Sequence, residues 1–158
     1  MVPSFRIRFV RALTCTRQIA VRHPEMLCEE ALALPRRIDD PASAATLARD
    51  LLRHRREDIT LALYLDERHR LCGTAMVAVG WVQQARLSAR QILLGGHACR
   101  AASVVLVRYG RYRGLRATEQ ERRSFAALAA ACSRHGLLVQ DHVVVTGCGR
   151  FASTLSAG

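Results

Sequence analysis

Residues 103–123, SVVLVRYGRYRGLRATEQERR, concentrate the side chains best suited to binding chemistry in this chain. Guanidinium groups neutralise phosphates and tyrosine rings stack on unpaired bases, so an arginine and tyrosine mixture is typical of single-stranded nucleic-acid binding. The candidate contacts are Arg108, Tyr109, Arg111, Tyr112, Arg113 and Arg116. The alternative interpretation is a solvated loop in which arginine side chains stack on the tyrosines. The segment therefore predicts nucleic-acid binding as one of the functions to be weighed.

This basic segment lies between a predicted strand and a predicted helix. The apolar run at 102–107 predicts a buried strand that ends where the arginines begin. Thr118 and Glu121 have the spacing of a capping box, in which the Thr118 hydroxyl accepts from the Glu121 amide and Glu121 reaches back to the cap. Apolar residues at helical spacing follow, and Gly136 ends the helix. These two elements position the ends of the loop.

Strands and helices alternate through the rest of the domain. Helices are predicted at 41–54 and 88–100, and strands at 59–65, 71–79, 137–146 and near Phe151. The first two strands are separated by a short polar turn at 66–69, which indicates a hairpin. The order predicts an α/β fold with a mixed sheet flanked by helices.

Residues 1–36 lack these signals. A short alternation of apolar and basic residues at 5–9 resembles a half-buried strand, and prolines interrupt the region. We therefore interpret 1–36 as a basic N-terminal arm and 37–158 as one domain. The alternating residues of the arm are suited to pairing with a strand edge of this domain or of a neighbouring chain.

Composition narrows the class of protein. The 158 residues carry a formal net charge of +11, and all 24 basic residues are arginine, which is compatible with a polyanionic partner. Apolar runs are far shorter than the ~18 residues of a membrane span, and arginines interrupt the N-terminal region, so we expect a cytoplasmic protein without membrane contact. Six cysteines without a C-x-x-C pair predict free, mostly buried thiols.

Three segments in order carry a resemblance to a known family. They are RREDITLALYLDERHRL at 55–71, ARQILLGGHACRAASVVLV at 89–107 and GLLVQDHVVV at 136–145. Together they resemble RadC-like JAB domains of the JAB/MPN (JAMM) metallopeptidase-like superfamily, over roughly residues 38 to 155. The resemblance implies a JAB/MPN-type, cytidine-deaminase-like mixed sheet flanked by helices. Members of this superfamily hold a zinc ion, and the resemblance implies that the zinc site would follow directly after the strand that is predicted to end at Val107.

The family's zinc ligands come from a His-x-His-Pro-Ser-Gly loop and a following Ser-x-x-Asp, which leave an open position for water. The resemblance places Arg108 and Gly110 at the two histidines and Glu121 at the aspartate. Arginine is not deprotonated in proteins and glycine has no side chain, so only Glu121 retains a ligating group. We therefore expect no zinc and no other cofactor, although zinc belongs to the ancestral family.

Other residues of types that could take part in catalysis lie outside the zinc-ligand positions. The resemblance places Glu57 at the base that activates the zinc-bound water, which makes it a vestigial catalytic candidate beside the alternative of a surface acid. His97 and Cys99 are two residues apart on a predicted helix and cannot share a metal. His142 corresponds to a structural position of the family. Neither a nucleophile elbow nor the deaminase zinc motif is present.

Three functions follow from these observations. The first is a non-catalytic scaffold or interaction domain, acting as a homodimer or with a protein partner, with a link to DNA repair or mobile elements implied by the resemblance. The second is nucleic-acid binding through residues 108–116. The third, and the least supported by the residues, is an active zinc metallopeptidase.

Overall fold

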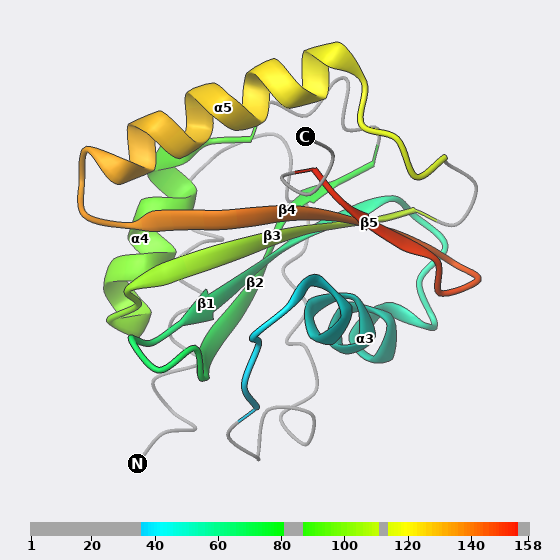
Figure 1. The fold of residues 1–158 in the computed structure, drawn as a ribbon, viewed down its shortest axis with the longest axis horizontal. Coiled ribbons are helices and arrows are strands. Elements are labelled where there is room, and N and C mark those ends of the chain that lie inside the picture. The colour runs from blue at the N-terminus through cyan, green and yellow to red at the C-terminus, as the bar shows by residue number, and fades with distance from the viewer. Residues whose placement is uncertain (1–35, 81–86, 111–113, 155–158) are drawn as a thin grey trace.

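The computed structural model describes residues 36–80, 87–110 and 114–154. The predicted arm at 1–36, including its strand-like residues 5–9, lies outside the described residues except for Arg36. Within the described part, three layers are stacked: α3 covers one face of a sheet, and α4 and α5 cover the other (Figure 1). The described helices include no candidate for a membrane-spanning segment.

The elements alternate as predicted. In chain order they are α3 (Pro41–Leu52), β1 (Ile59–Leu65), β2 (Leu71–Val79), α4 (Ala89–Cys99), β3 (Ser103–Gly110), α5 (Glu119–Ser133), β4 (Leu138–Thr146) and β5 (Phe151–Ser153). The two hairpin strands begin and end at the predicted residues. The sheet order is β2-β1-β3-β4-β5, with β3 and β4 parallel and the other neighbours antiparallel. The α/β fold with a mixed sheet flanked by helices is therefore confirmed.

One strand differs from the prediction in a way that matters for the site. We predicted that the third strand ends at Val107, but β3 continues to Gly110. Its last residues pair on both sides, Arg108 with Thr60 of β1 and Gly110 with Thr146 of β4. Pairing with two neighbours extends the strand through residues whose types had indicated a loop, because β propensity depends strongly on tertiary context.

Alternation along the strands divides the interior into two apolar layers. Leu61, Leu63, Val105, Val107 and Val143 face α3 and pack with its buried side chains. The residues between them, including Ala62, Val104 and Leu106, face α4 and α5. Because successive side chains of a strand point to opposite faces, neighbouring residues at the end of β3 also belong to different layers.

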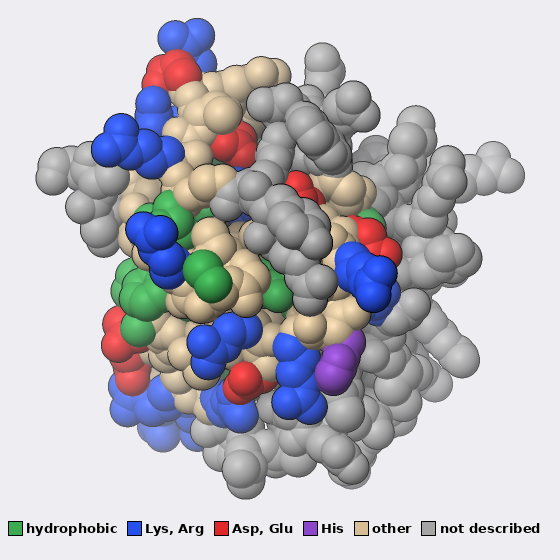
Figure 2. Space-filling view, turned by 90° about the vertical axis from the view of Figure 1, so that its right-hand side faces the viewer, with side chains coloured by type: hydrophobic (Ala, Val, Ile, Leu, Met, Phe, Trp, Pro, Cys, Tyr) green, Lys and Arg blue, Asp and Glu red, His purple; other side chains and the backbone are tan. Residues whose placement is uncertain are grey.

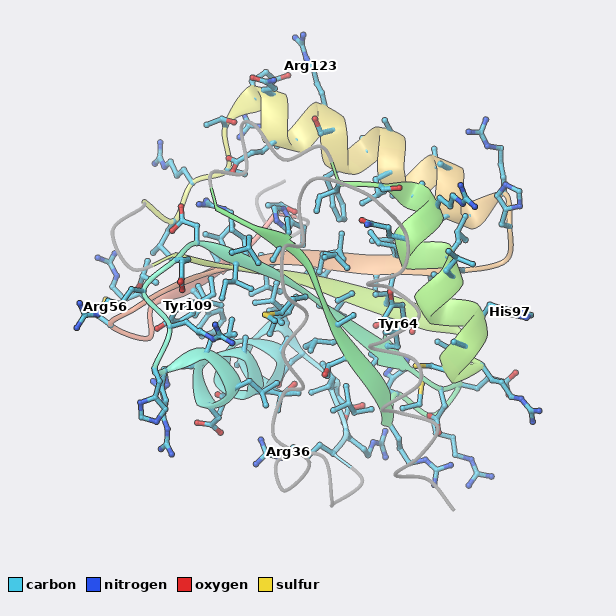
Figure 3. All side chains as sticks on the ribbon, turned by 180° about the vertical axis from the view of Figure 1, so that it is seen from behind. Arg36, Arg56, Tyr64, His97, Tyr109 and Arg123 are labelled. Carbon is cyan, nitrogen blue, oxygen red and sulfur yellow. The ribbon has the colours of Figure 1, made fainter. Side chains whose placement is uncertain are left out.

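Local signals fix the helix ends. The Asp40 side chain accepts from the Ser43 amide, and the Ser43 hydroxyl accepts from the Asp40 amide, which closes a capping box at α3. Thr118 and Glu121 close the second box at α5, as predicted. The Ser88 hydroxyl caps α4 by accepting from the Gln91 amide. A hydrogen bond also connects β1 to α4: the buried Tyr64 hydroxyl donates to the Ile92 carbonyl at 3.1 Å (Figure 3).

The start of the described chain is held to the hairpin. Arg37 forms an isolated antiparallel bridge with Arg70, the Ile38 amide donates to the His69 carbonyl and the Leu71 amide donates to the Arg36 carbonyl. Residues 36–38 are thus held by backbone hydrogen bonds to the end of the hairpin turn and the start of β2.

Candidate functional site

Arg108 lies inside the protein at the end of β3. Its side chain belongs to the α4/α5 face, two residues beyond Leu106 in the strand alternation, and only 2% of the residue is exposed. Burial of a guanidinium is costly unless it is paired, because the charge loses its hydration. The pairing is present: Nε of Arg108 lies 3.3 Å from Oε1 of Glu121.

Glu121 is positioned for this contact by the start of α5. Its other oxygen, Oε2, accepts from the Thr118 amide at 2.6 Å, and its own amide donates to the Thr118 hydroxyl at 3.1 Å. The capping box therefore holds the carboxylate with one oxygen on the helix end and the other on the Arg108 guanidinium. Arg108 is fixed from a second side, since Nη2 donates to the Gly114 carbonyl at 3.4 Å.

His142 adjoins this ion pair. It lies on β4 beside β3, and its ring stacks on Phe125 of α5 with centroids 5.2 Å apart. Burial, reinforced by the nearby Arg108 charge and opposed by Glu121 and Asp141, lowers the pKa of His142 to about 4. The imidazole is therefore neutral at pH 7. Among the described residues, its buried Nδ1 has no hydrogen-bond partner.

These three groups offer little acid–base chemistry. The Arg108 guanidinium keeps its proton, the Glu121 carboxylate is occupied by an amide and a guanidinium, and the neutral His142 ring is buried against Phe125. Within the part of the chain that the structure describes, no three His, Cys, Asp or Glu side chains are grouped so that they could hold a metal ion.

The donor set also does not fit zinc. Gly110, at the second predicted ligand position, is the last residue of β3 and is buried. Glu121 remains the single ligating group of the three predicted positions, and it already carries a cationic partner. A zinc ion would need more protein ligands and would stand beside a fixed positive charge.

The predicted base, Glu57, lies apart from a catalytic arrangement. It precedes β1 by two residues, its side chain is exposed, and its Oε2 accepts from the Arg56 amide at 3.3 Å. The placement corresponds to the surface-acid alternative. His97 and Cys99 both lie near the end of α4, with His97 exposed (Figure 3).

The structure corrects the predicted nucleic-acid loop at two positions. Arg108 and Tyr109 were expected to present their side chains to a ligand, but both are 2% exposed, on opposite faces of the sheet. Pairing of β3 with β1 and β4 draws them into the interior, and Tyr109 packs on the α3 side (Figure 3). Arg116 is exposed, as predicted. The remaining candidates lie outside the described residues: Arg111, Tyr112 and Arg113.

Two contributors to the site had not been predicted. Thr60 stands directly opposite Arg108 on β1, and its buried hydroxyl has no hydrogen-bond partner among the described residues. Phe125 is one of the apolar residues at helical spacing after Glu121, but its stacking on His142 depends on elements that are distant in sequence. The strand alternation could have indicated the face of Thr60, but the register required the fold.

Another polar pair lies outside this cluster. The Ser153 hydroxyl donates to Oδ1 of Asp141 at 2.8 Å, which connects the paired strands β5 and β4. Asp141 is adjacent in sequence to His142 on β4, and adjacent strand residues point to opposite faces, so the three do not form a catalytic triad.

None of the described cysteines forms a disulfide: Cys132 is buried, Cys72 and Cys99 are half-buried and Cys148 is exposed. Among these four, the predicted burial is therefore complete for Cys132, partial for Cys72 and Cys99, and absent for Cys148.

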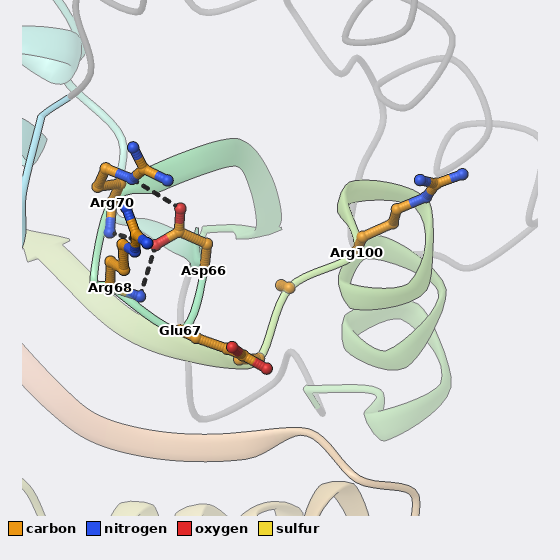
Figure 4. Close-up of a pocket in the computed structure, with 7 residues that line it drawn as sticks. Asp66, Glu67, Arg68, Arg70 and Arg100 are labelled. Atoms are coloured by element: carbon orange, nitrogen blue, oxygen red, sulfur yellow. Dashed lines mark hydrogen bonds and ion pairs between the residues drawn. The ribbon is translucent and has the colours of Figure 1, made fainter.

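A separate depression of about 540 Å³ opens at the other end of the sheet (Figure 4). It is lined by Asp66, Glu67, Arg68, Arg70 and Arg100 and by two alanines. Asp66 is engaged by Nε of Arg70 at 2.9 Å and by the amides of Arg68 and Arg70. Its carboxylate is thus used to shape the hairpin turn, and the buried ion pair remains the stronger candidate site.

Comparison with known proteins identifies the family. The family model described as RadC-like JAB domain matches residues 38–158, which is more than half of the chain. A search of curated proteins found no match. The matched range covers all the described strands and helices, including both partners of the ion pair. This chain therefore belongs to the RadC-like JAB domain family.

Proposed function

We propose that this chain is a metal-free RadC-like JAB domain that acts by binding rather than by catalysis. The observation that carries the proposal is the buried ion pair between Arg108 and Glu121. Glu121 stands at the position where the resemblance expects the last zinc ligand, and Arg108 stands at the first. A guanidinium thus supplies the positive charge opposite the carboxylate.

Electrostatics support this substitution. A buried carboxylate needs a cation or several hydrogen bonds to offset its lost hydration, and here the neutralising charge is covalently part of the chain. Zinc could reach Glu121 only by displacing the guanidinium, which would leave two cations close together in the interior. The cost of that arrangement would not be recovered from a single carboxylate ligand.

The rest of the scaffold is retained without the ligand set. The mixed sheet, its three covering helices and both capping boxes are all formed. Family resemblance suggests that metal-less members serve as scaffold or dimerising subunits. We therefore propose a second copy of this chain or a protein partner as its target, with any link to DNA repair or mobile elements belonging to this proposal.

Metal analysis of the purified protein tests the proposal. We expect zinc well below one ion per chain, and no rise in the unfolding temperature when zinc is added. The Glu57→Gln variant should match the wild type in both measurements. Stoichiometric zinc, together with a peptidase activity that Glu57→Gln abolishes, would contradict the proposal and support the zinc metallopeptidase. Size measurement in solution, alone and with candidate partners, tests the binding role.

A further inference from the structure

Four exposed arginines lie near one another without carboxylate partners. Arg49, Arg53, Arg56 and Arg150 are all exposed, and none forms an ion pair with an acid among the described residues. Many other surface arginines of the described chain are paired: Arg36 with Asp50, Arg37 with Asp39, Arg70 with Asp66, and Arg122 and Arg123 with Glu119.

The fold brings these four arginines together from two segments. Arg49 and Arg53 lie at the end of α3, Arg56 lies in the connection to β1, and Arg150 lies in the turn between β4 and β5. The Arg49 guanidinium lies so close to Gly149 that a Cβ there would clash with it, which joins α3 to the turn. Figure 3 shows Arg56 at the same end of the molecule, and Figure 2 shows several basic side chains on this end.

An exposed aromatic ring adjoins the same surface. Phe151 follows Arg150 directly and is 42% exposed. It pairs with Val145, whose side chain faces α3, so the Phe151 ring lies on the α3 side of the edge strand β5. Three large hydrophobic residues of the described chain are exposed, and Phe151 is the aromatic one.

Nearby acids do not cancel the charge. Asp50 is engaged by Arg36 at 3.6 Å, and the exposed Glu57 accepts from the Arg56 backbone. Unpaired guanidinium groups next to an exposed ring combine phosphate neutralisation with a stacking surface. A duplex keeps its bases stacked on one another, so an exposed ring favours single strands.

We infer that Arg49, Arg53, Arg56, Arg150 and Phe151 form a docking surface for single-stranded nucleic acid. The arginines contact backbone phosphates, and Phe151 stacks on an unpaired base. This surface is made of other residues than those predicted at 108–116, the first two of which are buried. It also goes beyond the proposed metal-free function, since it depends neither on zinc nor on the Arg108–Glu121 pair.

Fluorescence anisotropy of a short labelled oligothymidine, measured between about 50 and 200 mM salt, tests the surface. Each phosphate contact with a single strand contributes a log–log slope of about −0.7. Replacing all four arginines by alanine should therefore make the slope shallower by about 2.8. Between these two salt concentrations, the affinity of the wild type should therefore fall about 50-fold more than the affinity of the quadruple variant. Phe151→Leu should weaken binding about 5- to 150-fold, the range of one base-stacking contact.

Matched variants provide the controls. Arg122→Ala with Arg123→Ala removes two exposed arginines that are already paired, and Leu94→Ala removes another exposed hydrophobic side chain. Both should bind like the wild type, and all variants should keep its circular dichroism and unfolding temperature. Absence of binding at low salt would overturn the inference. So would an unchanged slope in the quadruple variant, or tighter binding of a duplex with no effect of Phe151→Leu.

Discussion

Replacing Arg108 by methionine would leave a buried carboxylate without its cation. The side chain of Glu121 is only 6% exposed, so water cannot readily replace the guanidinium at Oε1. Methionine keeps an unbranched apolar stem in place of the arginine stem, which limits the size of the cavity that the lost guanidinium leaves. The substitution therefore isolates the electrostatic part of the interaction.

The expected cost is large relative to the stability of a single domain. Removing one partner of a buried ion pair typically costs about 3 to 5 kcal/mol, because an uncompensated charge remains inside. Single domains unfold with about 5 to 15 kcal/mol, so Arg108→Met would remove a substantial fraction. For a chain of this size, the unfolding temperature should fall by about 6 to 20 °C.

A double-mutant cycle makes the prediction specific to the pair. Glu121→Gln keeps a residue that can serve in the capping box but removes the negative charge. We expect each single variant to be strongly destabilised in urea titrations, and the double variant to recover most of the loss. The coupling energy should be at least about 2 kcal/mol. A destabilisation below about 1 kcal/mol for Arg108→Met, or additive single effects, would refute this description of the buried ion pair.

Two further predictions concern neighbouring parts of the α4/α5 face. The pKa of His142 lies at about 4, below its ordinary 6.5. As the pH falls, the imidazole therefore takes up a proton in the unfolded chain before it does so in the folded protein. The free energy of unfolding should thus decrease as the pH falls from about 6.5 to 4. At about 1.4 kcal/mol per pH unit, the loss reaches about 3 kcal/mol, and His142→Phe should lack this component in urea titrations across that range. Gly73→Ala should cost about 1 to 3 kcal/mol, because the new Cβ would overlap Sγ of Cys99, and adding Cys99→Ala should restore most of the stability.

A different experimental result would contradict each of these two predictions. Carboxylates also titrate in the acidic range, so the relevant quantity is the difference between the wild type and His142→Phe. Parallel pH dependences would contradict burial of a neutral imidazole beside Arg108, Glu121 and Asp141. Equal stabilities of Gly73→Ala with and without Cys99→Ala would show that the thiol does not limit space at this strand.

The sequence predicted the elements better than it predicted the site. Capping residues and apolar alternation are local, and they placed the hairpin strands and the start of α5 correctly. The end of β3 was missed because Arg108, Tyr109 and Gly110 are not apolar, and only the two flanking strands explain their inclusion in the sheet. Tertiary pairing overrode the local pattern.

In the candidate site as well, local contacts were predicted and contacts between distant elements were not. Glu121 was predicted both as a capping residue and at a ligand position, and the structure places its two oxygens on the cap and on Arg108. The resemblance had placed Arg108 and Glu121 at ligand positions of one zinc site, but no local signal showed that they form a buried ion pair, which depends on how α5 crosses the sheet. The neutral His142 likewise depends on Phe125 and on burial, which have no local signal.

Net charge was the least specific signal. A formal charge of +11 is compatible with a polyanionic partner, but it does not show which arginines are accessible. Arg108 is buried in an ion pair, Arg122 is paired at the surface with Glu119, and Arg150 has no carboxylate partner among the described residues. Only three-dimensional placement separates these roles.

Zinc content, measured by elemental analysis on protein purified without chelator, tests the central claim most directly. The buried Arg108–Glu121 pair predicts zinc well below one ion per chain and an unfolding temperature that neither zinc nor a chelator changes. The Arg108→Met variant, measured in parallel, shows whether removal of the guanidinium alone changes metal binding. One tightly held zinc per wild-type chain, with stability lost on chelation, would contradict the account.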